Sequence, residues 1–129
     1  MPIVADMNDK LKRIGLYWLP LVLYCLAIFI QSSFKTPGQV PDLPMIDKIL
    51  HFVAYAIMGI LFFRAYRTLP IGNRQLLLVL LSILSAGLYG ISDEIHQHFV
   101  PFRNADSMDV LADFLGSIGG VAVYTRLVR

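Results

Sequence analysis

Three groups of polar side chains carry most of the chemistry that this sequence offers. In the first group, Asp47, His51 and Tyr55 recur at intervals of four residues, which places them on one face of a helix. Carboxylates and imidazoles are widely used for general acid–base catalysis, and they also bind cations and metals. We therefore predict that this helix face belongs to a functional site.

The second and third groups lie further along the chain. The second group comprises Asp93, Glu94, His96 and Gln97, and Arg103 follows it. In the third group, Asp109 and Asp113 are four residues apart, so they share a helix face and repel each other unless a cation intervenes. The alternative for Asp106 and Asp109 is a structural role at the start of a helix, as a cap and as a partner of the helix dipole.

The acidic side chains need compensating positive charge, which can come from two sources. The available cationic side chains are Lys48, His51, His96 and Arg103. A divalent metal bound by histidines and carboxylates is the alternative. The chain has no HExxH motif and no paired histidines at ligand spacing, so we expect no metal and no other cofactor.

The composition is typical of a membrane protein. Of the 129 residues, 57% are hydrophobic and 16% are charged, whereas soluble domains have about 25% charged residues. This length suits a single domain over residues 1–129. The basic residues form no run of the kind that binds nucleic acid, and the single Cys25 excludes an internal disulfide.

Four stretches are long and apolar enough to cross a bilayer, whose hydrocarbon core needs roughly 20 helical residues. The uncharged stretch between Arg13 and Lys35 is the clearest, and Pro20 is a candidate kink within it. The predicted helices are 14–33, 45–66, 75–98 and 107–127, with a turn-rich loop at 35–44. The sequence therefore predicts an all-α integral membrane protein, a bundle of four transmembrane helices.

Charge is divided unequally between the two ends of these helices. Eight of the 11 lysines and arginines lie in the N-terminal segment, the connection after the second helix and the C-terminus. The positive-inside rule then predicts that both termini are cytoplasmic. Seven of the nine acidic residues lie on the other, outer side, together with the three polar groups.

Small residues recur every four positions in the last helix, at Ala112, Gly116 and Gly120. Such stripes let membrane helices approach closely. We therefore expect a tightly packed bundle with a polar pocket that opens outward.

The polar residues also match the motifs of a known family. The chain resembles the VanZ-like family in three motifs, in the family's order: Asp47-Lys48-x-x-His51-Phe52-x-x-Tyr55, Tyr89-Gly90-x-x-Asp93-Glu94-x-His96-Gln97-x-Phe99-x-Pro101-x-Arg103 and Asp109-Val110-x-Ala112-x-x-x-Gly116. Phe102 stands where the family usually has glycine. Asp113 stands where it usually has asparagine, which adds a charge to the site.

The resemblance implies a multi-pass protein of the bacterial cytoplasmic membrane with a connection to the cell envelope. The family is similar to the membrane protein of glycopeptide-resistance clusters that is associated with reduced teicoplanin susceptibility. The resemblance implies no particular biochemical mechanism, so enzymatic and non-enzymatic hypotheses both stand.

The first hypothesis is a membrane enzyme that acts on a lipid or lipid-linked envelope molecule. Asp93 or Glu94 would be the general base, and His51 its acid or orienting partner. The substrate-binding residues would be Asp47, Lys48, Tyr55, His96, Gln97, Arg103, Asp109 and Asp113, with Lys48 and Arg103 holding an anionic group. The second hypothesis is a protein that binds an amphiphilic ligand without catalysis, and the third is a structural partner of a larger complex.

Overall fold

A computed structural model describes residues 2–34, 44–101, 103 and 105–129, and the described residues are helical apart from short connections. The elements are α1 (Pro2–Arg13), a π-helical turn η1 (Ile14–Trp18), α2 (Leu19–Ser32), α3 (Pro44–Tyr66), α4 (Gln75–His98) and α5 (Ser107–Leu127). Four helical stretches are long and apolar enough to cross a membrane. The predicted all-α membrane fold is confirmed, and the last three helices begin and end within one residue of the predicted bounds.

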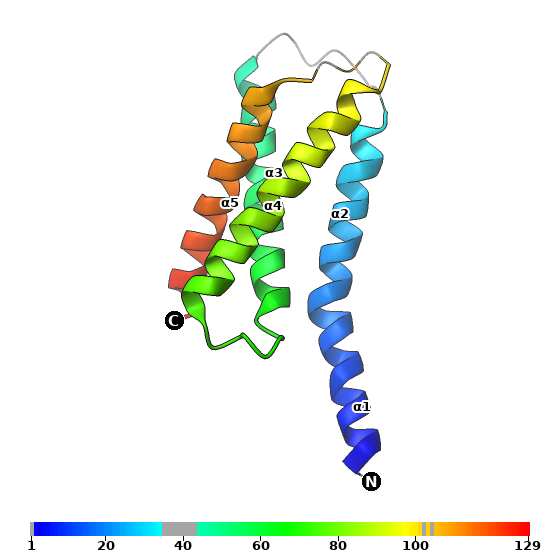
Figure 1. Ribbon diagram of the computed structural model, residues 1–129, viewed down its shortest axis with the longest axis vertical. Helices are drawn as coiled ribbons and strands as arrows, with labels where there is room; N and C mark the ends of the chain where they lie inside the picture. The colour runs from blue at the N-terminus through cyan, green and yellow to red at the C-terminus, as the bar shows by residue number, and fades with distance from the viewer. Residues whose placement is uncertain (1, 35–43, 102, 104) are drawn as a thin grey trace.

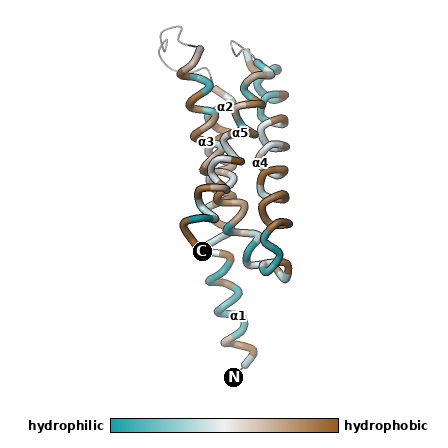
Figure 2. The backbone as a smooth tube through the Cα atoms, turned by 90° about the vertical axis from the view of Figure 1, so that its left-hand side faces the viewer, coloured by the Kyte–Doolittle hydropathy of each residue, from teal (hydrophilic) through white to brown (hydrophobic). Residues whose placement is uncertain are grey.

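The first helix differs from the prediction because it begins at Pro2 and not near residue 14. None of the 12 residues of α1 is buried, and α1 extends beyond the rest of the bundle as a mostly polar helix (Figures 1 and 2). The prediction used the length of the apolar stretch, which gives no information about a helix that continues into water. The irregularity near Pro20 is the π-helical turn η1, in which the Leu19 N–H donates to the Ile14 carbonyl. Because proline has no N–H, the regular hydrogen-bond pattern is interrupted at this point.

Helices α3 and α5 form the most extensive helix pair, α4 packs against both, and α2 lies against α3 and α4 (Figure 1). The predicted small-residue stripe lies in the α3–α5 contact. A Cβ atom at Gly116 would lie 2.1 Å from the Phe52 carbonyl oxygen, and one at Gly120 would lie 2.3 Å from that of Ala56. Only glycine allows the two backbones to come this close, so the expected close packing is confirmed.

The distribution of polarity is the reverse of that in a soluble protein. The buried polar residues are Ser32, Ser82, Asp93, Glu94, Gln97, Asp109, Asp113 and Ser117. Many large apolar side chains are exposed along the helices, among them Leu23, Leu84 and Leu115 at 50–55%. A surface of this kind is stable when lipid covers it, and this agrees with the four membrane spans.

Both chain ends and the connection between α3 and α4 lie at one end of the bundle, and the beginnings of α3 and α5 lie at the other (Figure 1). The arrangement therefore agrees with four alternating crossings. That the first of these ends is cytoplasmic stays a prediction. The predicted loop at 35–44 falls on residues 35–43, which lie outside the described residues, as does Phe102.

Candidate functional site

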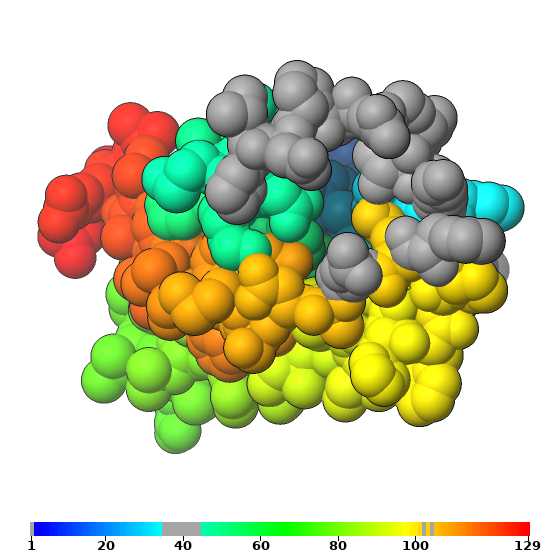
Figure 3. Space-filling model, turned by 90° about the horizontal axis from the view of Figure 1, so that it is seen from above, coloured from blue at the N-terminus to red at the C-terminus, as the bar shows by residue number. Residues whose placement is uncertain are grey.

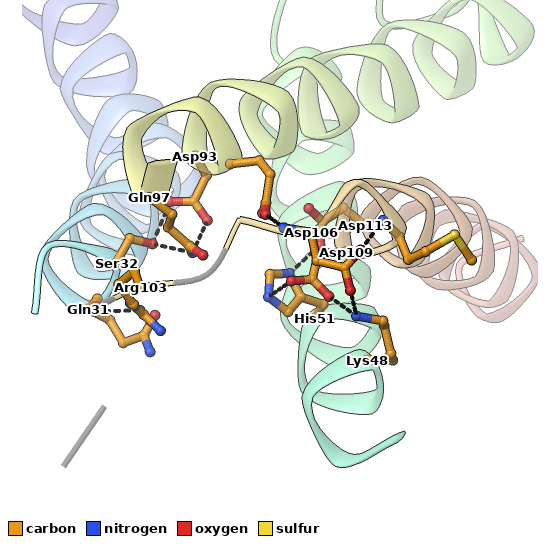
Figure 4. A network of polar contacts seen from close by, with 12 residues as sticks. Gln31, Ser32, Lys48, His51, Asp93, Gln97, Arg103, Asp106, Asp109 and Asp113 are labelled. Carbon is orange, nitrogen blue, oxygen red and sulfur yellow. Dashed lines mark hydrogen bonds and ion pairs between the residues drawn. The ribbon is translucent and has the colours of Figure 1, made fainter. Parts of the chain in front are cut away.

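The structure brings the three polar groups together at the end of the bundle where α2 and α4 finish and α3 and α5 begin (Figures 1 and 4). The groups form two networks. The carboxylate–histidine cluster consists of Lys48, His51, Glu94, Asp106, Asp109 and Asp113. The serine–aspartate network consists of Ser32, Asp93 and Gln97.

Lys48 connects the start of α3 to the start of α5. Its Nζ donates to Asp106 Oδ2 and to Asp109 Oδ1, both at 2.6 Å. Asp109 is only 2% exposed, so its carboxylate depends on such a partner. Asp106 caps α5 by accepting from the Met108 N–H at 2.9 Å, which is the structural role that the sequence analysis gave as the alternative. Lys48 and this N–H hold the pKa of the Asp106 carboxyl below its usual range.

His51 lies between the two carboxylates that would otherwise repel each other. Its Nδ1 is 2.8 Å from Asp113 Oδ1, and its Nε2 is 3.5 Å from Asp109 Oδ2. The ring also stacks on Tyr55, with 6.3 Å between the centroids. Seen from this end of the molecule, the first turns of α3 and α5 lie in contact, which is what allows these bonds (Figure 3).

Glu94 links α4 to the same cluster by accepting a hydrogen bond from the Asp106 backbone N–H. Gly90, one turn earlier in α4, makes room for Asp113. A Cβ atom at position 90 would lie 2.6 Å from Asp113 Oδ2. The Tyr89-Gly90-x-x-Asp93-Glu94 motif therefore supplies both an acidic group and the space in which a second acidic group packs.

The serine–aspartate network joins α2 to α4. Ser32 Oγ donates to Asp93, and Gln97 Nε2 lies 3.3 Å from both Ser32 Oγ and Asp93 Oδ2 (Figure 4). The sequence analysis missed Ser32. The signal was available, because Gln31, Ser32 and Ser33 end an otherwise apolar span on the side that holds the other polar groups.

Two predicted binding residues contact the end of α2. Arg103 Nη2 donates to the Gln31 carbonyl at 3.0 Å, and His96 Nε2 lies 2.9 Å from Ser33 Oγ. The His96 ring also stacks on Phe29 at 4.7 Å. These contacts bind the end of α4 and the residues after it to α2, whereas Lys48 and His51 are the cationic partners of Asp109.

Three buried side-chain oxygens have no hydrogen-bond partner within the part of the chain that the structure describes. They are Tyr55 Oη, Glu94 Oε2 and Asp113 Oδ2, from α3, α4 and α5. Tyr55 is 1% exposed, and its ring stacks on His51 of the carboxylate–histidine cluster. Leaving a buried polar group unpaired costs about 1–3 kcal/mol, so a bound group that formed hydrogen bonds with these oxygens would gain part of that free energy.

Two residues of the cluster, together with Asp47, have the donor atoms of a cation site. Asp47, His51 and Asp109 each offer one ligand atom, and these atoms lie within 4.8 Å of one another. Two carboxylates and an imidazole suit a divalent transition metal. Because Lys48 already donates to Asp109, a metal at this position would compete with an existing ion pair.

A family model described as VanZ/LLP1 matches residues 7–129, a range that contains all three motifs and α2 to α5. No curated protein and no solved structure matches the chain.

Proposed function

The chain is a membrane protein of the VanZ/LLP1 family, and we propose that it binds the polar headgroup of a lipid or lipid-linked envelope molecule at the carboxylate–histidine cluster. The observation that carries the proposal is the set of three buried, unpaired oxygens within the described residues. Each comes from a different helix, so a group that bonded to all three would contact α3, α4 and α5 at once.

The charges of the cluster favour a ligand that brings hydrogen-bond donors. The cluster contains four carboxyl groups and two cationic side chains, Lys48 and His51, and these two cations pair with Asp106, Asp109 and Asp113. Acidic groups therefore outnumber cationic groups by two to one. The Lys48 ammonium already donates to two carboxylates. An ammonium or hydroxyl-bearing headgroup therefore fits this cluster better than the anionic group that the sequence suggested for Lys48.

The exposed apolar faces of the same helices support an amphiphilic ligand. Phe52 and Val53, beside His51 on α3, are 42% and 50% exposed, and Leu111 on α5 is 48% exposed. Lipid chains cover such faces, so a headgroup that reaches the cluster from the bilayer keeps its acyl chains in contact with apolar side chains.

Tyr55→Phe tests the proposal, because it removes one unpaired hydroxyl and no hydrogen bond of the described chain. We expect the variant to be as stable as the parent in detergent and to bind ligand several-fold more weakly. Tyr66→Phe is the matched control, since the Tyr66 hydroxyl bonds Ser85 Oγ at 2.6 Å near the opposite end. It should lower stability by about 1 kcal/mol and leave binding unchanged.

Binding is measured by native mass spectrometry of the purified chain with two probes. Phosphatidylethanolamine has an ammonium that donates hydrogen bonds, whereas the methylated ammonium of phosphatidylcholine has no N–H. Preference for phosphatidylethanolamine, lost in Tyr55→Phe and kept in Tyr66→Phe, supports the proposal. Equal retention of both probes, or of co-purified lipids, by the parent and Tyr55→Phe overturns it.

A second candidate function, a proton-transferring enzyme, is favoured by the His51–Asp113 pair at 2.8 Å. A carboxylate that orients an imidazole is the arrangement used to activate nucleophiles in many hydrolases. In this hypothesis Glu94 is the base and His51, oriented by Asp113, is its acid partner, so Glu94→Gln abolishes turnover of a bound lipid while the lipid is still retained. Conversion of the bound lipid, followed by mass spectrometry over time, distinguishes the two candidates.

We propose a role in glycopeptide resistance from the family resemblance alone. If it holds, a susceptible bacterium that expresses the parent chain tolerates more teicoplanin than one that expresses Tyr55→Phe at the same membrane abundance. If these two strains and an empty-vector strain are equally susceptible to teicoplanin, the chain has no role in resistance.

A further inference from the structure

A cavity of about 390 Å³ lies at the end of the bundle opposite the carboxylate–histidine cluster. Its lining residues are Arg13, Tyr17, Arg64, Arg67, Thr68 and Tyr124. They come from the end of α1, from η1, from the end of α3 and the turn after it, and from the end of α5. We propose that this basic cavity binds the phosphate-bearing headgroup of an anionic phospholipid.

The charge of the cavity points to an anion. It is lined by three arginines and no acidic residue, and all ion pairs found among the described residues lie at the other end of the bundle. Arg64 stands over the Tyr17 ring, 5.4 Å from its centroid, which positions its guanidinium at the cavity. Guanidinium groups bind phosphate through two parallel hydrogen bonds, so three of them suit one or two phosphate groups.

The cavity is held together by contacts between segments that are far apart in the sequence. Trp18 Nε1 donates to Thr68 Oγ1 at 2.9 Å, and Thr68 Oγ1 donates to the Ala65 carbonyl at 2.7 Å. Trp18 also packs edge-on against Tyr66 at 6.1 Å. These contacts attach η1 to the end of α3, so Arg13 and Arg67 face a common space.

The surroundings of the cavity favour a lipid over a free phosphate ion. Tyrosines and tryptophans gather at the level of lipid headgroups, and Tyr17, Trp18 and Tyr124 all lie at this end. Apolar side chains next to them in sequence are exposed, with Leu16 at 62% and Val123 at 56%. A bound headgroup would therefore place its acyl chains against apolar helix faces, and basic cavities between membrane helices are known sites for anionic headgroups.

The test compares two double variants that each remove two positive charges from the same end. Arg13→Gln with Arg67→Gln changes the cavity, and Lys12→Gln with Arg74→Gln changes only side chains that do not line it. The melting temperature of the purified chain in detergent is measured at increasing concentrations of phosphatidylglycerol, phosphatidylcholine or inorganic phosphate. We expect phosphatidylglycerol to stabilise the parent and the control, with about tenfold weaker affinity in the cavity variant.

Three results overturn the proposal. If both double variants bind phosphatidylglycerol with equal affinity, the cavity is not the binding site. An equal response to phosphatidylcholine shows that the headgroup charge is irrelevant, and stabilisation by inorganic phosphate alone assigns the cavity to a free ion. If the cavity variant does not fold, Arg13→Gln alone is compared with Lys12→Gln, because α1 has no buried residue and neither change affects packing. Tyr55→Phe should leave this binding unchanged, which separates it from the proposed function.

Discussion

Replacing Lys48 with methionine should destabilise the protein through one neighbouring carboxylate. Lys48 Nζ donates to Asp106 and Asp109 at 2.6 Å, but the two partners differ in burial, with 45% and 3% of their side chains exposed. Water can solvate Asp106 after the substitution, whereas among the described residues Asp109 keeps only His51 Nε2, at 3.5 Å, as a cationic partner. Breaking a buried pair costs about 3–5 kcal/mol, and because Lys48 is itself 27% exposed we expect a loss of about 3 kcal/mol.

A double-mutant cycle isolates this effect. Asp109→Asn removes the buried charge, so Lys48→Met should cost much less in the Asp109→Asn background than in the parent. We expect a coupling energy of about 2 kcal/mol between the two positions. The free energy of unfolding is measured in detergent for the parent, both single variants and the double variant. Lys12→Met is the control, because α1 has no buried residue and the change should be nearly neutral.

Two results would refute this reasoning. If Lys48→Met and Lys12→Met unfold alike, the ion pair with Asp109 contributes nothing to stability. If the changes in the free energy of unfolding caused by the two single substitutions are additive in the double variant, Lys48 stabilises the protein through a group other than Asp109.

Four further predictions follow from the structure. Gly116→Ala should destabilise the bundle by at least about 2 kcal/mol, because the new Cβ would meet the Phe52 backbone. Gly119→Ala should be tolerated, because its Cβ would meet only the edge of the Phe52 ring, at 3.3 Å. The free energy of unfolding in detergent is compared for the two variants. Arg103→Ala should lower the melting temperature more than Arg103→Lys, because lysine keeps the positive charge but lacks the planar guanidinium group. A cysteine at position 73 in a Cys25→Ser background should not react with a thiol reagent added outside intact cells. Labelling from outside would show that the predicted orientation is wrong. Addition of EDTA should leave the melting temperature unchanged, and a fall reversed by a divalent metal would show that the cation site is used.

The positions of the last three helices could be predicted because the signals are local. A run of apolar residues between charges sets where each helix crosses the bilayer, and the rise per residue sets its length. The same arithmetic places all three polar groups at one end of the bundle. The start of α1 was predicted wrongly because no apolar run or charge marks where a helix ends in water.

Tertiary structure decided which side chains meet. Asp93 and Glu94 are neighbours in the sequence and were candidates for the same role, yet Asp93 contacts Ser32 on α2 and Glu94 contacts the start of α5. Successive residues on a helix point about 100° apart, so two adjacent carboxylates face different neighbours once α4 is packed between α2 and α5.

The sequence by itself determined the membrane spans, the family and the end of the bundle at which polar groups gather, because hydropathy and spacing are properties of each segment. Only the packed structure decided that Lys48 and His51 compensate Asp109, that Arg103 contacts the end of α2, and that three oxygens remain unpaired within the described chain. Partner choice depends on how the helices rotate and how closely they approach. Contacts such as that of Gly116 with Phe52, between residues far apart in the sequence, set both.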